Sequence, residues 1–343
     1  MSDEFQPRAV SEIETLKRLE GIFLPHSSVL REGKRQADNP GQPPSRDNRG
    51  KFVHYTSAEA ALKIIRTRRL WMRSTTCMAD YGEVQHGYRL LTTYFRQPEK
   101  HTAFFAAMDS ICPDIARAAF AAFDQWWSTI RTNTYITSVS EHGSSKEDQF
   151  GRLSMWRSFG AGQPRVALVF SIPWESQASL ALNMTFGPVS YLAEFAAHGN
   201  LDLCVAKVKQ EADWLRAVPA DQFRAALFQM LATTVCCQKH EGFWEEREWR
   251  GVYLHGFGHP TLLERSSEVI GGLPQPIFKI PLDASVSPHL IDLDLTNSLS
   301  RIIIGPTSYS WVVYEAFVEA LSGAGISEPQ AKVWASNLPI RES

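Results

Sequence analysis

The sequence lacks a long hydrophobic run, a cysteine framework and an excess of charge of either sign. A membrane-spanning helix needs about 18 consecutive apolar residues, and no stretch approaches that length. The five cysteines are scattered, which argues against the disulfide framework of a small secreted domain. The 35 basic and 37 acidic residues nearly balance, unlike in proteins dedicated to nucleic acid or anionic membranes. Because the first residues are also acidic and polar, unlike a secretory signal peptide, we expect a cytoplasmic protein with no membrane partner.

Several common functional motifs are absent as well. We find no phosphate-loop signature, no G-x-G-x-x-G after a predicted strand and no G-x-S-x-G. Nucleotide hydrolysis, Rossmann dinucleotide binding and α/β-hydrolase chemistry therefore have no support. His255 and His259 are four residues apart, but Gly256 and Gly258 disfavour the helix that would bring them together. We predict no metal site.

Length and composition favour a large folded chain. The 343 residues are 44% hydrophobic and 21% charged, values typical of globular proteins. Helices and strands are predicted without a regular strand–helix–strand repeat, which favours the α+β class over a doubly wound sheet. Strands are predicted at 52–56, 70–75, 134–140, 165–172, 246–254, 277–282, 300–304 and 331–336. Helices are predicted at 10–24, 57–68, 81–95, 219–238 and 309–322, with two more inside 101–131 that are separated at Pro113.

The N-terminal region is predicted to differ from the rest of the chain. Residues 26–51 contain Pro, Gly, Asn and charged residues with hardly any apolar ones, so we predict a flexible polar arm without regular structure. Its six lysines and arginines could contact a phosphate backbone, although a solvated arm is the stronger interpretation. The predicted domains are residues 1–51 (a helix and the arm) and 52–341 (a single α+β domain), with helical insertions near 81–131 and 194–238.

Polar side chains gather in three clusters at the edges of predicted strands, at residues 54–57, at 137–140 followed after a loop by 154–160, and at 239–250. Strand alternation places Ser138 and Ser140 on one face of the second cluster. It likewise places Glu246, Glu248 and Arg250 on one face of the third. Neighbouring carboxylates repel each other unless cations or ligand hydroxyls lie close. Because charged strand ends are common, a purely structural network of ion pairs is an alternative to a functional site.

A set of short motifs follows in a defined order along the chain. They are HYTS at 54–57, LWMRST at 70–75, Asp80 and Glu83 in D-x-x-E, TSVS at 137–140, WRSFG at 156–160, WEEREWR at 244–250, IGP at 304–306 and SNLPIR at 336–341. Together they resemble an uncharacterised bacterial family catalogued as domain of unknown function 2971, over about residues 52 to 341. One position departs from that family, which has Asn-Asp where this chain has Ala79-Asp80. The family name implies no chemistry.

The order of a His-containing strand, a Ser-x-Ser strand and a Glu-x-Glu strand is also similar to the ADP-ribosyltransferases. This resemblance implies a central split or mixed sheet and NAD as the substrate. It implies that His54 holds the NAD ribose and that Ser138 and Ser140 brace the nicotinamide side. Glu248 would bond to a ribose hydroxyl, and Glu246 would orient or deprotonate the acceptor. The further residues that the resemblance suggests for NAD binding are Tyr55, Thr56, Trp156 and Arg157, with either Tyr55 or Trp156 stacked on nicotinamide.

The resemblance implies an enzyme that transfers ADP-ribose from NAD to an unknown acceptor, protein or nucleic acid, or to water as an NAD glycohydrolase. Because such reactions harm a cell, a toxin or phage-defence effector is a natural role. One alternative is a non-catalytic module that binds a nucleotide or nucleic acid, and another is a different enzyme acting on nucleic acid. For the first interpretation we expect one cleft lined by His54, Ser138, Trp156 and Glu248, with Arg157 and Arg250 beside it.

Overall fold

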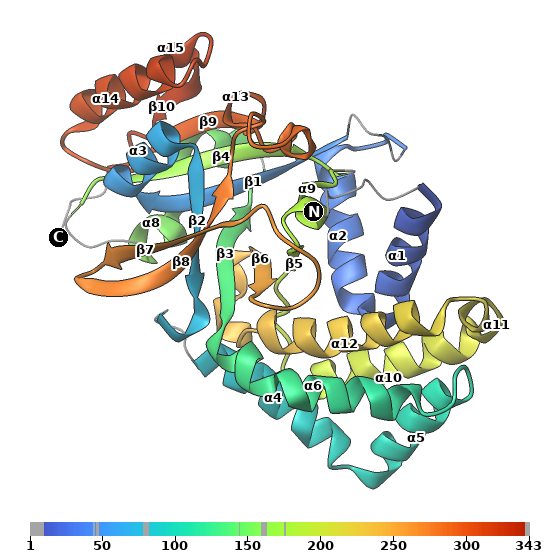
Figure 1. The fold of residues 1–343 in the computed structure, drawn as a ribbon. Coiled ribbons are helices and arrows are strands. Elements are labelled where there is room, and N and C mark those ends of the chain that lie inside the picture. Colours follow the sequence, from blue (N-terminus) through green and yellow to red (C-terminus); the bar gives the residue numbers. More distant parts are fainter. Residues whose placement is uncertain are drawn as a thin grey trace.

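The protein combines a ten-stranded mixed sheet with a large helical layer in this computed structural model (Figure 1). The structure describes residues 10–43, 45, 48–77, 82–143, 145–158, 163–174 and 176–339. Helices and strands are mixed along the chain and the sheet is open, so the predicted α+β class is confirmed at this level. Among the described residues, no helix is long and apolar enough to cross a membrane.

The strands follow the order β10-β9-β4-β1-β3-β2-β8-β7, with β6 beside β3 and β5 beside β6. Neighbouring strands are antiparallel except β9 and β10, which are parallel. The strands are β1 (Arg49–Ser57), β2 (Arg69–Ser74), β3 (Thr134–Glu141), β4 (Arg165–Pro173), β5 (Thr185–Pro188), β6 (Glu248–Leu254), β7 (Glu264–Ile270), β8 (Leu273–Pro281), β9 (Leu299–Ile304) and β10 (Val333–Ala335).

The sheet divides along one edge of β3. On that edge β1 pairs with residues 140–141, and β2 pairs with residues 135–136. Between these pairings, residues 137–139 face the gap where β1 and β2 diverge, which we call the fork. The other edge of β3 pairs with β6 along residues 134–140. One limb beyond the fork is β1-β4-β9-β10 and the other is β2-β8-β7 (Figure 1).

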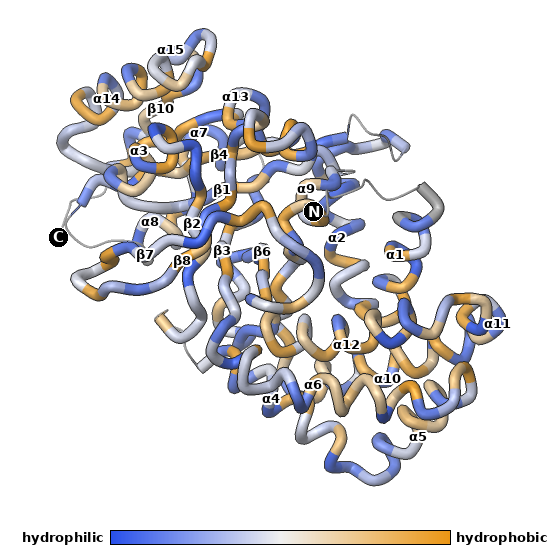
Figure 2. Tube along the Cα trace, in the orientation of Figure 1, coloured by the Kyte–Doolittle hydropathy of each residue, from blue (hydrophilic) through white to orange (hydrophobic). Residues whose placement is uncertain are grey.

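Most of the long helices pack into one layer below and to the right of the sheet in Figure 1. Their apolar faces form the largest core, which also takes in Ile136 of β3 and Val252 of β6. Figure 2 shows hydrophobic segments where these helices face one another. The helices of this layer are α1 (Val10–Phe23), α4 (Gly82–Phe95), α5 (Pro98–Asp109), α6 (Ile115–Thr132), α10 (Glu194–Gln210), α11 (Ala212–Arg216) and α12 (Ala220–Cys236). The predicted helical insertions, including the separation of α5 and α6 around Pro113, are confirmed.

The remaining helices are shorter or lie against the limbs of the sheet. Ser57 caps α3, because its hydroxyl accepts the backbone N–H of Ala60 at 3.2 Å, as the sequence predicts. These elements are α2 (Pro25–Asp38), α3 (Ala58–Thr67), η1 (Thr75–Cys77), α7 (Ser145–Phe150), α8 (Leu153–Ser158), α9 (Ala178–Ala181), η2 (Glu241–Glu246), η3 (Pro288–Leu290), α13 (Leu295–Ser298), α14 (Ser310–Gly323) and α15 (Pro329–Lys332).

The prediction of an irregular arm at 26–51 is wrong for most of that segment. Helix α2 occupies its first half, and β1 begins at Arg49 rather than at Phe52. The helix is held by polar contacts, which is why an apolar pattern does not reveal it. Buried Lys34 bonds to Asp38 at 2.5 Å and to the carbonyl oxygen of His142 at 3.0 Å. Helix α7 is a second difference, because it lies between two predicted strands in a segment for which the sequence predicts no helix.

Candidate functional site

His54 lies at the fork, where β1 leaves β3. Its Nδ1 is 2.9 Å from the backbone carbonyl oxygen of Ser138. Because a carbonyl only accepts, Nδ1 carries the proton, and Nε2 of the neutral ring carries the acceptor lone pair. Burial lowers the pKa of His54 below its usual value, with the bond to Ser138 opposing the shift. The ring is therefore neutral at pH 7, and both His54 and Ser138 are partly exposed at the fork.

Ser138 connects the fork to a buried carboxylate on β6. Its hydroxyl donates to Oε1 of Glu248 at 2.5 Å. Arg250 binds the same carboxylate through two bonds, from Nε to Oε1 at 2.7 Å and from Nη2 to Oε2 at 2.9 Å. The backbone N–H of Glu248 donates to the hydroxyl of Tyr191 at 2.8 Å. Glu248 is 6% exposed and Arg250 3% exposed, so this bidentate pair lies inside the protein.

Lys239 and Glu83 extend the pair into a charge cluster. Lys239, which is 4% exposed, lies 2.7 Å from Glu246, 3.0 Å from Glu83 and 3.6 Å from Glu248. Arg250 also donates to Glu83 from α4. We define the charge cluster as Glu83, Lys239, Glu246, Glu248 and Arg250, which together contain one more carboxylate than cations.

The two acidic residues of the Glu-x-Glu motif have opposite pKa shifts. Burial acts to raise the pKa of Glu248, but Arg250, Lys239 and the Ser138 hydroxyl together hold it below its usual value. Burial raises the pKa of Glu246, with Lys239 opposing the shift. Burial opposes the charged form of Lys239, yet the carboxylates around it raise its pKa. Glu248 is therefore the more firmly ionised member of the motif.

Glu246 does not lie on the strand, contrary to the predicted strand start at residue 246. It ends the 3₁₀ turn η2, and β6 begins only at Glu248. Arg247 between them has a φ of 42°, which breaks the strand geometry. The shared face that alternation predicts therefore holds for Glu248 and Arg250 only. Glu246 still reaches the cluster through its bond to Lys239.

Tyr55 and Trp156 lie in a separate apolar cluster. Their rings pack edge to face at 4.9 Å, and the Tyr55 hydroxyl accepts the backbone N–H of Arg152 at 2.8 Å. The Trp156 indole is 1% exposed and donates to the carbonyl oxygen of Phe150 at 2.7 Å. Neither face of that indole is open for stacking, so the structure does not bring Trp156 into one cleft with Glu248.

The other predicted binding residues are scattered around this region. Ser140 is buried on β3 directly opposite Glu248 on β6, and Thr56 is partly exposed on β1 beyond the fork. Arg157 is exposed on α8, whereas Arg250 belongs to the charge cluster. Asp80 lies outside the described residues.

Lys239 and Tyr191 are the members of this arrangement whose roles the sequence did not reveal. Lys239 follows α12, and Tyr191 follows β5, far along the chain from His54. A lysine seven residues before a Glu-x-Glu segment gives a weak signal that a cation pairs with the acids. Nothing in the local sequence around Tyr191 indicates its contact, because that contact depends on β5 pairing with β6.

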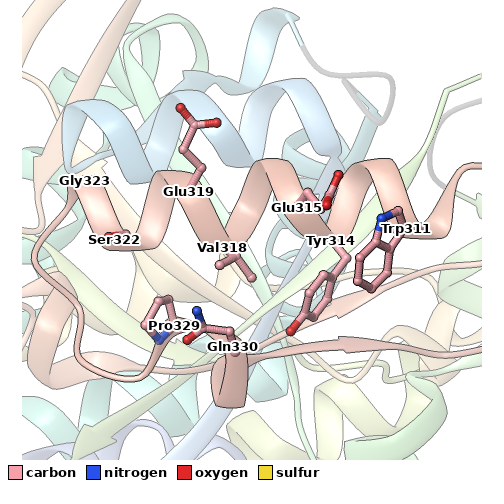
Figure 3. A pocket seen from close by; sticks show the side chains of 9 residues that line it. All are labelled: Trp311, Tyr314, Glu315, Val318, Glu319, Ser322, Gly323, Pro329 and Gln330. Atoms are coloured by element: carbon pink, nitrogen blue, oxygen red, sulfur yellow. The ribbon is translucent and has the colours of Figure 1, made fainter.

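A groove lies away from the fork, along α14 and α15 (Figure 3). This groove measures about 630 Å³, and Trp311 and Tyr314 stack at one end of it with ring centroids 5.4 Å apart. Its other lining residues are Glu315, Val318, Glu319, Ser322, Gly323, Pro329 and Gln330. No residue of the charge cluster lines it, so the groove is separate from the site at the fork.

In the part of the chain that the structure describes, no three His, Cys, Asp or Glu residues are placed to hold a metal ion. The site is therefore built from a neutral imidazole, a serine hydroxyl and the charge cluster. Comparison with protein-family models, with curated proteins and with solved structures found no match to this chain.

Proposed function

We propose that the protein is an NAD-dependent enzyme that transfers ADP-ribose to an acceptor, or to water as an NAD glycohydrolase, and that the fork is its NAD site. The observation that carries this proposal is the continuous series of contacts from His54 through Ser138 to Glu248. These residues belong to the three motifs that resemble the ADP-ribosyltransferases, and they come from adjacent strands β1, β3 and β6. The resemblance also implies a central split or mixed sheet.

The chemistry suits an acid-rich cluster. In the reaction, the bond between nicotinamide and C1′ of the ribose breaks, and its electron pair leaves with nicotinamide. Positive charge develops on the sugar, as in glycoside cleavage. The charge cluster holds one carboxylate in excess, and a fixed carboxylate in a dry site stabilises such charge more than it would in water.

The residues divide the remaining tasks. The acceptor oxygen or nitrogen forms the new bond to C1′ and releases a proton. Glu246 is suited to take that proton, because its raised pKa makes it the better base of the pair, and Lys239 orients it. His54 is suited to hold a ribose hydroxyl through Nε2, since Nδ1 is fixed on Ser138. A ribose hydroxyl that reaches Glu248 takes over the bond that Ser138 now donates.

A non-catalytic nucleotide or nucleic-acid binding module is the second candidate. It is favoured by the number of bonds to Glu248, whose two oxygens already accept from Ser138 and twice from Arg250. A carboxylate so engaged is suited to organising the fork as well as to catalysis. Such a module binds NAD or a related nucleotide without consuming it.

Incubation of the full chain with NAD, with free nicotinamide measured over time, separates the two candidates. The enzyme releases nicotinamide, whereas the module produces only a rise in melting temperature. Glu248→Gln keeps the size of the side chain and removes the charge, so we expect turnover to fall about a hundredfold. NAD affinity changes much less, because the sugar carries little charge before the bond lengthens. His54→Ala mainly weakens NAD binding.

A matched control is Glu268→Gln on β7, which removes a carboxylate that pairs with Lys279 and accepts from the Ser266 hydroxyl, away from the charge cluster. This variant should retain full turnover. If Glu248→Gln also retains full turnover with an unchanged melting temperature, the transferase proposal is wrong. NAD binding without turnover in the unaltered protein favours the module.

A further inference from the structure

An apolar cavity lies on the face of β3 opposite the charge cluster. It measures about 150 Å³, and strands from both limbs of the fork line it. Thr137 and Val139 of β3 form its floor, between Phe52 of β1 and Leu70 of β2. Ser138 and Ser140 alternate with these residues, so the cavity and the charge cluster lie on opposite faces of one strand.

Aromatic rings form one wall of the cavity. Phe52 packs edge to face against Trp174 at 5.7 Å and against Phe186 at 5.1 Å, and all three line the cavity. Trp174 and Phe186 are only partly buried, so this wall reaches the surface and gives a ligand a way in. The charged lining residue, Arg31, is bonded to Glu20 at 3.1 Å and to the carbonyl oxygen of Phe186 at 2.6 Å. An anion is therefore not what the cavity is built to hold.

Two residues that line the cavity carry a buried polar atom without a hydrogen bond. Among the described residues, Thr137 Oγ1 and Trp174 Nε1 have no partner, and Thr137 is 7% exposed. The neighbouring Trp249 differs, because its Nε1 donates to Glu141 at 2.9 Å. A buried polar group without a partner costs stability. Two buried polar groups without a partner, on residues that line one cavity, favour a ligand that bonds to them.

We propose that this cavity binds a neutral molecule the size of one six-membered ring that carries a hydroxyl or carbonyl group. An engineered protein cavity of about 150 Å³ holds benzene, so the volume admits one such ring. The aromatic wall suits a planar ligand. The indole N–H donates to the polar group of the ligand, and the threonine hydroxyl donates or accepts. Burial of an unpaired charge there is unfavourable, so the ligand is neutral. This site does not depend on the proposed NAD chemistry.

Isothermal titration of the full chain with phenol and with toluene tests the proposal. The two probes have nearly the same shape, and only phenol carries a hydroxyl. We expect phenol to bind about three- to tenfold more tightly, the range that one hydrogen bond contributes. In Thr137→Val, which keeps the shape of the side chain, this preference should shrink while toluene affinity is retained. Benzoate, which is charged, should bind more weakly than either.

A cavity-filling variant locates the binding. Val139→Phe places a ring in the cavity, and we expect both probes to lose at least about tenfold in affinity. The matched control is Val269→Phe at an exposed position of β7, which should bind both probes as the unaltered protein does. The proposal is overturned if toluene binds as well as phenol, or if neither binds. It is also overturned if Thr137→Val leaves the preference for phenol unchanged.

Discussion

Successive residues of β3 face two different environments. Ser138 points to a face where ionised groups are paired with one another, as in the bidentate bonds from Arg250 to Glu248. Thr137 points to a face of aromatic and aliphatic side chains around a cavity, and its hydroxyl has no partner among the described residues. The first face depends on every partner being present, because each removal leaves a buried charge unpaired. The second already contains an unmet bond, so a polar group can be removed there at little cost.

The largest expected effect comes from breaking the charged face. Arg250→Met replaces the guanidinium with an apolar side chain of similar length and leaves Lys239 as the remaining cluster cation beside the carboxylates of Glu248 and Glu83. We expect the free energy of unfolding to fall by about 3–5 kcal/mol, which urea denaturation measures. Arg216→Met removes half-exposed Arg216 from its surface pair with Asp213 and should change it by less than about 1 kcal/mol. Equal losses in the two variants would contradict the dependence of the charged face on its buried partners.

The pH dependence of the free energy of unfolding distinguishes the two acids of the Glu-x-Glu motif on the charged face. The pKa of Glu248 is lowered in the folded protein. Its ionised form therefore adds to the free energy of unfolding in full above the unfolded pKa of about 4.3, and this contribution is lost as the pH falls through the folded pKa. The stability difference between the unaltered protein and Glu248→Gln should therefore shrink below about pH 4. Glu246 has a raised pKa, so its ionised form costs stability.

The stability difference between the unaltered protein and Glu246→Gln should therefore change in the opposite direction as the pH falls. Urea denaturation of the three proteins at a series of pH values between 7 and 3 measures both trends. Parallel trends for the two variants would show that the opposite pKa shifts are wrong.

The fork itself gives a smaller effect. His54→Phe removes the bond to the Ser138 carbonyl, and we expect a loss of about 1–2 kcal/mol, because that carbonyl then lies at a partly buried edge without a strand partner. His54→Asn retains an N–H donor near the position of Nδ1 and should lose less. Thermal melting of both variants checks the difference, and equal losses would show that the ring's bulk, rather than its hydrogen bond, supports the fork.

Local patterns in the sequence were sufficient for most elements of the fold. The cap at Ser57, the separation of helices at Pro113 and the alternation along β3 depend on residues close together in the chain. The predicted order of His54, Ser138 and Glu248 also corresponds to contacts in space. These are properties that residue type and spacing determine directly.

What the sequence could not predict depends on distant contacts. Helix α2 is held partly by Lys34 reaching the carbonyl of His142, 108 residues away. A tryptophan pattern does not distinguish a ligand platform from a core residue, and Trp156 is core because Gly151 and Gly305 leave room for its ring. An added Cβ atom would lie 2.5 Å from that ring at Gly151 and 2.9 Å from it at Gly305. The cavity likewise forms only when both limbs of the sheet are in place.

The smallest effect tests the contrast on two adjacent residues. Ser138→Ala removes the hydroxyl that bonds to Glu248, and we expect a loss of about 1–2 kcal/mol in the free energy of unfolding, since a bond to a charged group is broken. Thr137→Val removes a hydroxyl with no partner among the described residues and replaces it with a methyl group that suits both the apolar cavity and a strand.

For Thr137→Val we therefore expect no loss, and a gain of up to about 1 kcal/mol, because the cost of burying that hydroxyl is no longer present. Urea denaturation of the two variants, measured side by side at pH 7, gives both signs in one experiment. Opposite signs at neighbouring positions require that the two faces of β3 differ as the structure describes. A comparable loss in Thr137→Val would mean that its hydroxyl has a partner, such as an ordered water, and that the polar lining of the cavity is already satisfied without a ligand.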